Sequence, residues 1–198
     1  MFNPTISIES VNDLPIAEFN GEIVAVSTPK EAKKALKELS HEWLLGFDTE
    51  TRPSFTPLQG NLHKTALLQL ATGEKAFLFR LALCGGVSFG LKRLLSNPKV
   101  IKVGAAVKDD IKGLQFYRHF HPAGFVDLQS ITGSFGINEK SLKKLTAIVL
   151  GLRLSKGQQL SNWESFELTP AQRQYAALDA WACREIYVQL HLNHPINQ

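Results

Sequence analysis

The chain has 198 residues, of which 44% are hydrophobic and 20% charged, with a net charge of +4 and a pI of about 9.1. This composition is typical of a globular protein large enough for one hydrophobic core. The apolar runs are short and the N-terminus lacks a signal-peptide pattern, so we expect no membrane-spanning segment. Only Cys84 and Cys183 are present. Two cysteines give no disulfide framework, which favours a cytoplasmic location.

The first half of the chain is rich in predicted strands. A helix should begin at the capping box Thr28-Pro29-Lys30-Glu31 and run to about Leu39. The turn Thr72-Gly73 is typical of a hairpin. The predicted strands cover residues 22–26, 43–50, 65–70 and 75–79.

Helices dominate the second half. After a strand over residues 100–103, the expected helices cover residues 107–119, 142–150 and 169–190, with shorter pieces at 91–95 and after Phe125. The last of these helices opens with a second capping box, Thr169 to Gln172. Early strands followed by interspersed helices predict an α/β fold, in which an antiparallel meander and later β-α-β crossovers form one mixed central sheet flanked by helices.

Two acids, Asp48 and Glu50, close a buried strand. Side chains alternate along a strand, so both carboxylates should point to the same side. Adjacent carboxylates repel each other unless a positive group lies between them, and a divalent cation fits that position. The alternative is a pair of solvated acids where the strand meets a loop.

A third acid lies at one of two adjacent positions, Asp109 or Asp110. Val107, Ile111 and Leu114 mark the apolar stripe of this helix, and Asp110 shares that stripe. An acid on such a stripe needs a partner, so we select Asp110. Asp109 is interpreted as a first-turn acid stabilised by the helix dipole.

Tyr175 and Asp179 are four residues apart on the last helix, which places them on one face. A tyrosine hydroxyl beside a metal-binding carboxylate can orient or help to deprotonate a water molecule. The alternative is a half-buried tyrosine and a salt-bridged aspartate. Small residues nearby, Ala176, Ala177 and Ala180, would let this helix approach the sheet closely.

Three stretches together resemble the motifs of the DEDDy 3′–5′ exonucleases of the ribonuclease H-like superfamily. They are residues 47–50, 103–110 and 175–180. Within that family the likeness is to the Werner-syndrome exonuclease domain and, more distantly, to ribonuclease D. It covers about residues 22–190, inside a single exonuclease domain expected to span residues 1–198.

The resemblance implies a ribonuclease H-like fold and a site for two divalent cations, Mg²⁺ or Mn²⁺. Asp48, Glu50, Asp110 and Asp179 match the metal-binding acids of the family, and Tyr175 matches the tyrosine that positions the attacking water. The implied reaction is hydrolysis of phosphodiester bonds at nucleic-acid 3′ ends, with release of nucleoside 5′-monophosphates. DNA and RNA both remain open as substrates.

Several residues are candidates for substrate contacts. The loop after the first motif carries Arg52, Phe55 and Lys64, which could touch the terminal nucleotide. Lys156 closes a basic stretch that starts at Glu139, its single acid, and also contains Lys140, Lys143, Lys144 and Arg153. Such a run is compatible with a phosphate-rich partner or with a solvated helix face. We expect Asp127 to be structural and Trp163 to belong to the core.

Two other functions remain open at this point. A haloacid-dehalogenase-like phosphatase also places acids at a strand end, but its second acid is an aspartate, so Glu50 fits poorly. That chemistry also leaves Tyr175 and Asp179 without a role. The second alternative is a nucleic-acid-binding module without catalytic activity, which the presence of all the expected residues disfavours.

Overall fold

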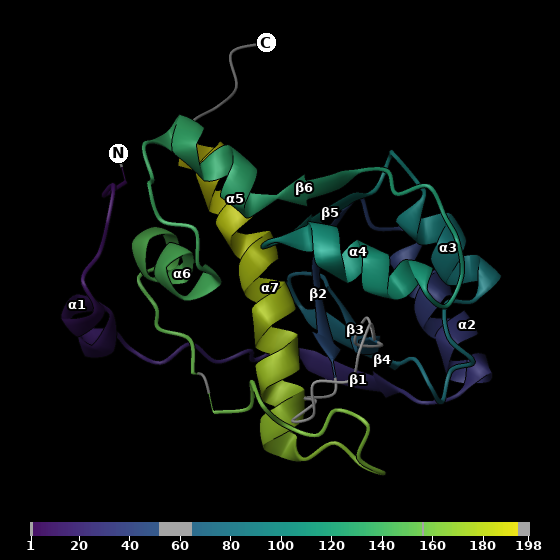
Figure 1. The fold of residues 1–198 in the computed structure, drawn as a ribbon. Helices are drawn as coiled ribbons and strands as arrows, with labels where there is room; N and C mark the ends of the chain where they lie inside the picture. Colours follow the sequence, from purple (N-terminus) through teal and green to yellow (C-terminus); the bar gives the residue numbers. More distant parts are fainter. Residues whose placement is uncertain (1, 52–64, 156, 194–198) are drawn as a thin grey trace, which may run out of the picture.

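A six-stranded mixed sheet forms the centre of the computed structural model, which describes residues 2–51, 65–155 and 157–193 (Figure 1). The strand order is β1-β4-β3-β2-β5-β6. Strands β2, β3 and β4 form the predicted antiparallel meander, and β5 and β6 add to β2 in parallel. Strand β1 lies parallel to β4 at the other edge. The strands are β1 (Glu22–Val26), β2 (Leu44–Thr51), β3 (Thr65–Ala71), β4 (Lys75–Arg80), β5 (Ile101–Gly104) and β6 (Phe125–Asp127).

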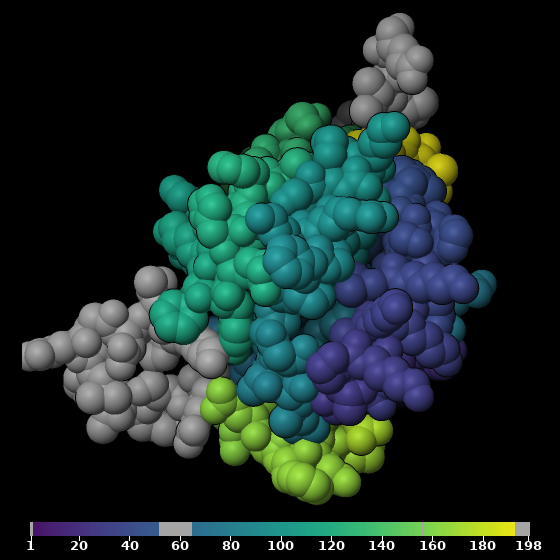
Figure 2. Space-filling view, turned by 90° about the vertical axis from the view of Figure 1, so that its right-hand side faces the viewer, coloured from purple at the N-terminus to yellow at the C-terminus, as the bar shows by residue number. Residues whose placement is uncertain are grey.

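Helices cover both faces of this sheet, which confirms the predicted fold class. Helices α2, α3 and α4 pack on one face, which Figure 2 views from outside, and α6 and α7 pack on the other. No helix in the described ranges is long and apolar enough to cross a membrane. The helices are α1 (Ile8–Asp13), α2 (Pro29–Leu39), α3 (Phe89–Leu95), α4 (Val107–Gln115), α5 (Leu128–Ile131), the 3₁₀ helix η1 (Thr132–Phe135), α6 (Leu142–Leu150) and α7 (Pro170–Asn193).

Side-chain hydrogen bonds fix the ends of the predicted helices. At the start of α7 the Thr169 hydroxyl accepts from the Gln172 backbone N–H, and the Gln172 side chain accepts from the Thr169 N–H. This is the reciprocal capping box that the sequence predicts. Helix α4 is shorter than predicted, because the chain turns after Phe116 and the Gln115 amide donates to the Phe120 carbonyl.

The alternation of β2 assigns its side chains to two different layers. Leu45 and Phe47 belong to the core under α2, α3 and α4, whereas Leu44 packs against Cys183 and neighbouring residues of α7. The same alternation places Asp48 on the α7 side of the sheet. Because every second residue shares a face, Glu50 is also on that side.

Helix α7 crosses one face of the sheet (Figure 1) and packs closely against β2. Gly46 makes this possible, since a Cβ atom at that position would lie 1.8 Å from the carbonyl oxygen of Ala180. Ala176, Ala177 and Ala180 are fully buried and present only methyl groups to the strands. The close approach carries the side chain of Asp179 to the end of β2.

We predict that Gly46→Ala destabilises the protein by about 2–3 kcal/mol, because the added methyl group collides with backbone and forces α7 away from β2. Chemical denaturation measures this change. Gly133→Ala is the control, since nothing lies within 4 Å of its added Cβ atom. Equal stabilities of the two variants would contradict the close packing of α7.

Candidate active site

Three carboxylates from two elements meet at the C-terminal end of β2. Asp48 and Glu50 come from the strand and Asp179 comes from α7. One carboxylate oxygen of each lies within 4.8 Å of those of the other two. The strand alternation and the short distance between α7 and β2 together produce this cluster, which we call the acid cluster.

Tyr175 lies one helical turn before Asp179, and its hydroxyl is close enough to the acids that their charges add to the effect of burial in raising its pKa. Its ring lies against Trp163, with ring centroids 6.0 Å apart and planes tilted by 35°. Trp163 is only 1% exposed, as expected for a core residue. Trp163 therefore supports the face of α7 that presents Tyr175, a contact that the sequence did not reveal.

Asp110 reaches the site from the opposite side of β2. It lies outside the acid cluster, and the hydroxyl of Thr49 donates to its Oδ1 atom over 2.6 Å. Its neighbour Asp109 is 89% exposed at the side chain and pairs with Lys112 at 2.8 Å. The two adjacent acids thus have different environments. Sequence reasoning missed Thr49, although strand alternation already placed it on the face opposite to Asp48.

Asp127 holds the turn that orients the start of α4. Its Oδ1 atom accepts from the backbone N–H of Ala106 at 3.0 Å and from that of Gln129 at 2.9 Å. Ala106 has a φ of 61°, in the left-handed region of backbone conformation that residues other than glycine rarely adopt. The Asp127 carboxylate therefore stabilises a strained turn four residues before Asp110, which agrees with the expected structural role.

Burial raises the pKa of all four acids, and the charges of neighbouring site acids add to the shift at Asp48 and Glu50. Burial raises the pKa of Glu50 to about 8, and the charges of Asp179 and Asp110 add to the shift. Burial also raises the pKa of Asp179 to about 7, against the opposing effect of the Tyr175 hydroxyl. The pKa of Asp48 is well above its usual value because of burial and the charges of Asp179, Glu50 and Asp110. Burial raises the pKa of Asp110 to about 6.

The charge of this site is uncompensated by the described part of the protein. None of the four acids forms a salt bridge with a lysine, arginine or histidine of the described residues. Carboxylate oxygens are the ligands that Mg²⁺ and Mn²⁺ prefer. The donor set and its spacing therefore fit divalent cations.

The predicted substrate contacts fall in parts of the chain that the structure leaves undescribed. Arg52, Phe55, Lys64 and Lys156 all lie outside the described residues. In the basic stretch before Lys156, several side chains are engaged in local contacts. Lys144 pairs with Glu139, Lys140 donates to the Gln129 carbonyl, and Arg153 donates to the Leu14 carbonyl.

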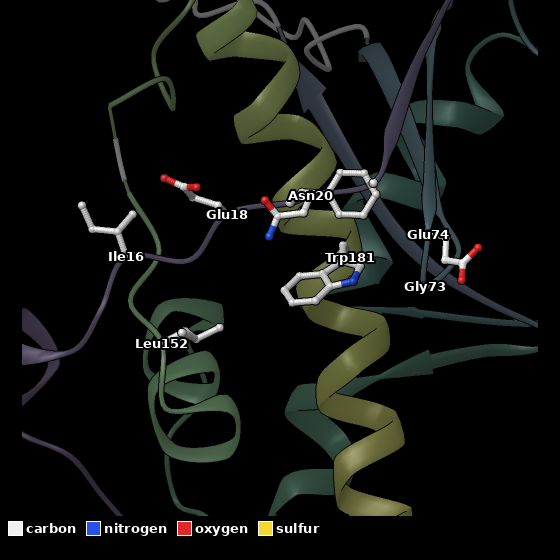
Figure 3. Close-up of a pocket in the computed structure, with 9 residues that line it drawn as sticks. Ile16, Glu18, Asn20, Gly73, Glu74, Leu152 and Trp181 are labelled. Carbon is white, nitrogen blue, oxygen red and sulfur yellow. The ribbon is translucent and has the colours of Figure 1, made fainter.

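A pocket of about 600 Å³ lies away from the acids (Figure 3). Its lining includes Gly21 and Glu74, which immediately precede β1 and β4, together with Glu18 and Trp181. Because β1, β4 and β2 run in the same direction, this pocket is at the end of the sheet opposite to the acid cluster. It is therefore separate from the candidate active site.

We predict that the metal-free protein loses stability as the pH rises from about 5 to 8. The folded state keeps protons on Glu50 and Asp179 that the unfolded chain releases near pH 4, so raising the pH favours unfolding. Each retained proton contributes roughly 1.4 kcal/mol per pH unit to this slope. Urea denaturation in a chelator at several pH values measures it. Asp179→Asn should flatten the slope, and an identical slope in that variant would contradict the assignment.

Three comparisons with known proteins agree with this geometry. Residues 23–194 match the 3′–5′ exonuclease family. The mouse bifunctional 3′–5′ exonuclease/ATP-dependent helicase WRN is 32% identical in an alignment 193 residues long; the match covers 90% of this chain and 13% of the mouse protein. The Aedes aegypti Nibbler EXO domain superimposes with a TM-score of 0.78 at 23% identity, over 89% of this chain and 91% of that one. Escherichia coli RNase D superimposes with a TM-score of 0.75 at 22% identity, and the superposition covers 85% of this chain and 44% of RNase D. Because the family match covers most of the sequence, the chain belongs to the 3′–5′ exonuclease family.

Proposed function

We propose that this chain is a metal-dependent 3′–5′ exonuclease of the DEDDy type, which releases nucleoside 5′-monophosphates from nucleic-acid 3′ ends. The observation that carries the proposal is the acid cluster, with Tyr175 one helical turn before Asp179 on α7 and its hydroxyl near the acids. Family membership supports the same activity.

The four acids would hold two divalent cations, Mg²⁺ or Mn²⁺. Such cations lower the pKa of the attacking water and stabilise the charge on the leaving oxygen. Asp48 is central among the acids, since Glu50, Asp179 and Asp110 all raise its pKa, and it is suited to serve both ions. Asp110 adds negative charge from the α4 side and is oriented by the Thr49 hydroxyl.

Tyr175 is suited to align a water molecule beside Asp179. Burial and the surrounding acids raise the pKa of its hydroxyl, so the group stays protonated and acts as a hydrogen-bond donor. Packing of the ring against Trp163 restricts the position of that hydroxyl. An aligned donor of this kind contributes to the orientation of a reacting water.

The proposed substrate class is a DNA or RNA strand with a free 3′ end. Ribonuclease D of Escherichia coli is an exoribonuclease, and the mouse relative combines an exonuclease with a helicase. The fold that this chain shares with such proteins supports nucleic acid as its partner. The chain would contact the phosphates of the strand, and such contacts are independent of base sequence. The predicted cytoplasmic location is part of this proposal, and the two buried thiols are compatible with it.

Neither alternative function explains the arrangement as well. A phosphatase of the haloacid-dehalogenase type has no use for Tyr175 and Asp179, whose side chains lie close to each other in the structure. A silent binding module does not require carboxylates within 4.8 Å of one another. Release of mononucleotides, as opposed to cleavage of a small phosphomonoester or binding alone, distinguishes the three functions.

We predict that Asp48→Ala abolishes cleavage and that Asp110→Asn loses most of it, because both remove negative charge from the metal site. Asp109→Asn is the matched control and should keep near-normal activity, since Asp109 faces solvent. The assay follows 5′-labelled single-stranded DNA, recessed DNA and RNA with Mg²⁺ or Mn²⁺. Near-normal turnover of Asp48→Ala at saturating metal would contradict the assignment of the site.

Tyr175→Phe should slow hydrolysis by roughly 10²-fold, because the hydroxyl that orients the water is lost. Binding of the strand should change little, since the ring and its contact with Trp163 are retained. Single-turnover cleavage and equilibrium binding are measured in parallel on one substrate. An unchanged cleavage rate would show that Tyr175 serves only in packing. A loss of binding would show that its hydroxyl contacts the substrate.

A further inference from the structure

Gln69 lies directly opposite Asp48 in the sheet. The two residues are register partners in the antiparallel pair β2/β3, so their side chains lie on the same face. The neighbours of Gln69 at alternate positions, Leu67 and Ala71, pack with alanines of α7. Gln69 therefore points into the layer between the sheet and α7, which is the layer that contains the acid cluster.

This side chain is buried without hydrogen-bond partners among the described residues. Gln69 is 0% exposed, and both its Nε2 and Oε1 atoms lack a partner there. A buried polar group in this state destabilises a fold by about 1–3 kcal/mol. Leucine or methionine would fill the same space between the sheet and α7 without leaving polar atoms unpartnered. The stability of the fold therefore does not explain a glutamine at this position.

The other acids of the site show what kind of partner Asp48 lacks. The Thr49 hydroxyl donates to Asp110, and the Tyr175 hydroxyl lies near Asp179 and opposes the rise in the pKa of that carboxyl. For Asp48 the structure shows no side-chain donor among the described residues, and the nearby backbone N–H of Thr49 is the one group that opposes the rise in its pKa. Gln69 is a neutral donor on the adjacent strand and on the same face. Hydrogen bonds from residues that surround the metal ligands orient metal-binding carboxylates and raise metal affinity.

We propose that Gln69 is the positioning residue for Asp48, and that its amide Nε2–H donates a hydrogen bond to the Asp48 carboxylate when that carboxylate binds the divalent cation. The inference rests on the metal-dependent function proposed above. In the metal-free protein the unpartnered amide lowers the stability of the fold, and in the metal-bound protein it would raise the affinity for the cation. One substitution should therefore change stability and metal affinity in opposite directions.

The test is Gln69→Met, which keeps the length of the side chain and removes both polar atoms. We expect a tenfold or greater loss of Mn²⁺ affinity in calorimetric titrations. In a chelator the melting temperature should stay the same or rise, because the unpartnered amide is gone. The rate of strand cleavage should fall at sub-saturating Mn²⁺ and recover in part at high Mn²⁺.

Thr132→Val is the matched control. Thr132 is also 0% exposed with an unpartnered hydroxyl, but it lies in η1, away from the acids. Its replacement should leave Mn²⁺ affinity unchanged. Gln69→Leu repeats the test if the methionine variant fails to fold.

Two results separate the failure of this proposal from the failure of the function on which it rests. If the wild type binds Mn²⁺ and Gln69→Met binds it equally well, Gln69 does not position Asp48, whatever the melting temperatures are. If the wild type and Asp48→Ala bind Mn²⁺ equally, the acids are not the metal site and the proposed function itself is wrong.

Discussion

The burial of several carboxylates within a few ångströms of one another is the interaction on which the rest of the structure depends. Burial disfavours the charged form of each carboxyl and raises the pKa of Asp48, Glu50, Asp179 and Asp110, and repulsion between like charges adds to the shift at Asp48 and Glu50. Such an arrangement opposes folding unless protons or cations compensate it. We infer that the fold tolerates this penalty because the cluster is the binding site for cations.

The elements around the site act to bring the acids together. Gly46 and the alanines of α7 allow helix and strand to approach until backbone nearly meets backbone. On the other face, Asp127 holds the strained turn at Ala106 and thereby sets the start of α4. The two helices reach the end of β2 from opposite sides of the sheet, so each contributes an acid that the strand alone lacks.

Much of this site follows from the sequence, because it depends on short-range periodicity. Alternation along the strand placed Asp48 and Glu50 on one face, and the structure brings them together with Asp179. The apolar stripe of α4 distinguished Asp110 from Asp109, and the two have different environments. The meander and the crossovers were also predictable, since hairpin turns and capping boxes are local signals.

Features that depend on tertiary contacts escaped the sequence. The burial of Gln69 opposite Asp48 follows from the register between strands, which one chain segment does not encode. Lys102 is in a strand that reads as apolar, yet its Nζ atom is buried and lies within hydrogen-bond distance of four carbonyl oxygens, those of Leu94, Asn97, Val100 and Ala123. The short α1 and η1 span too few residues for a helical period to be visible.

Proton release on metal binding tests the central claim most directly. Mn²⁺ is titrated into the protein at pH 7 in two buffers with different enthalpies of ionisation, so that the heat of binding reports the protons exchanged. Because the pKa of Glu50 is raised to about 8 and that of Asp179 to about 7, we expect roughly one proton or more to leave per chain. Saturable binding that releases no protons, or no saturable binding at all, would contradict the account.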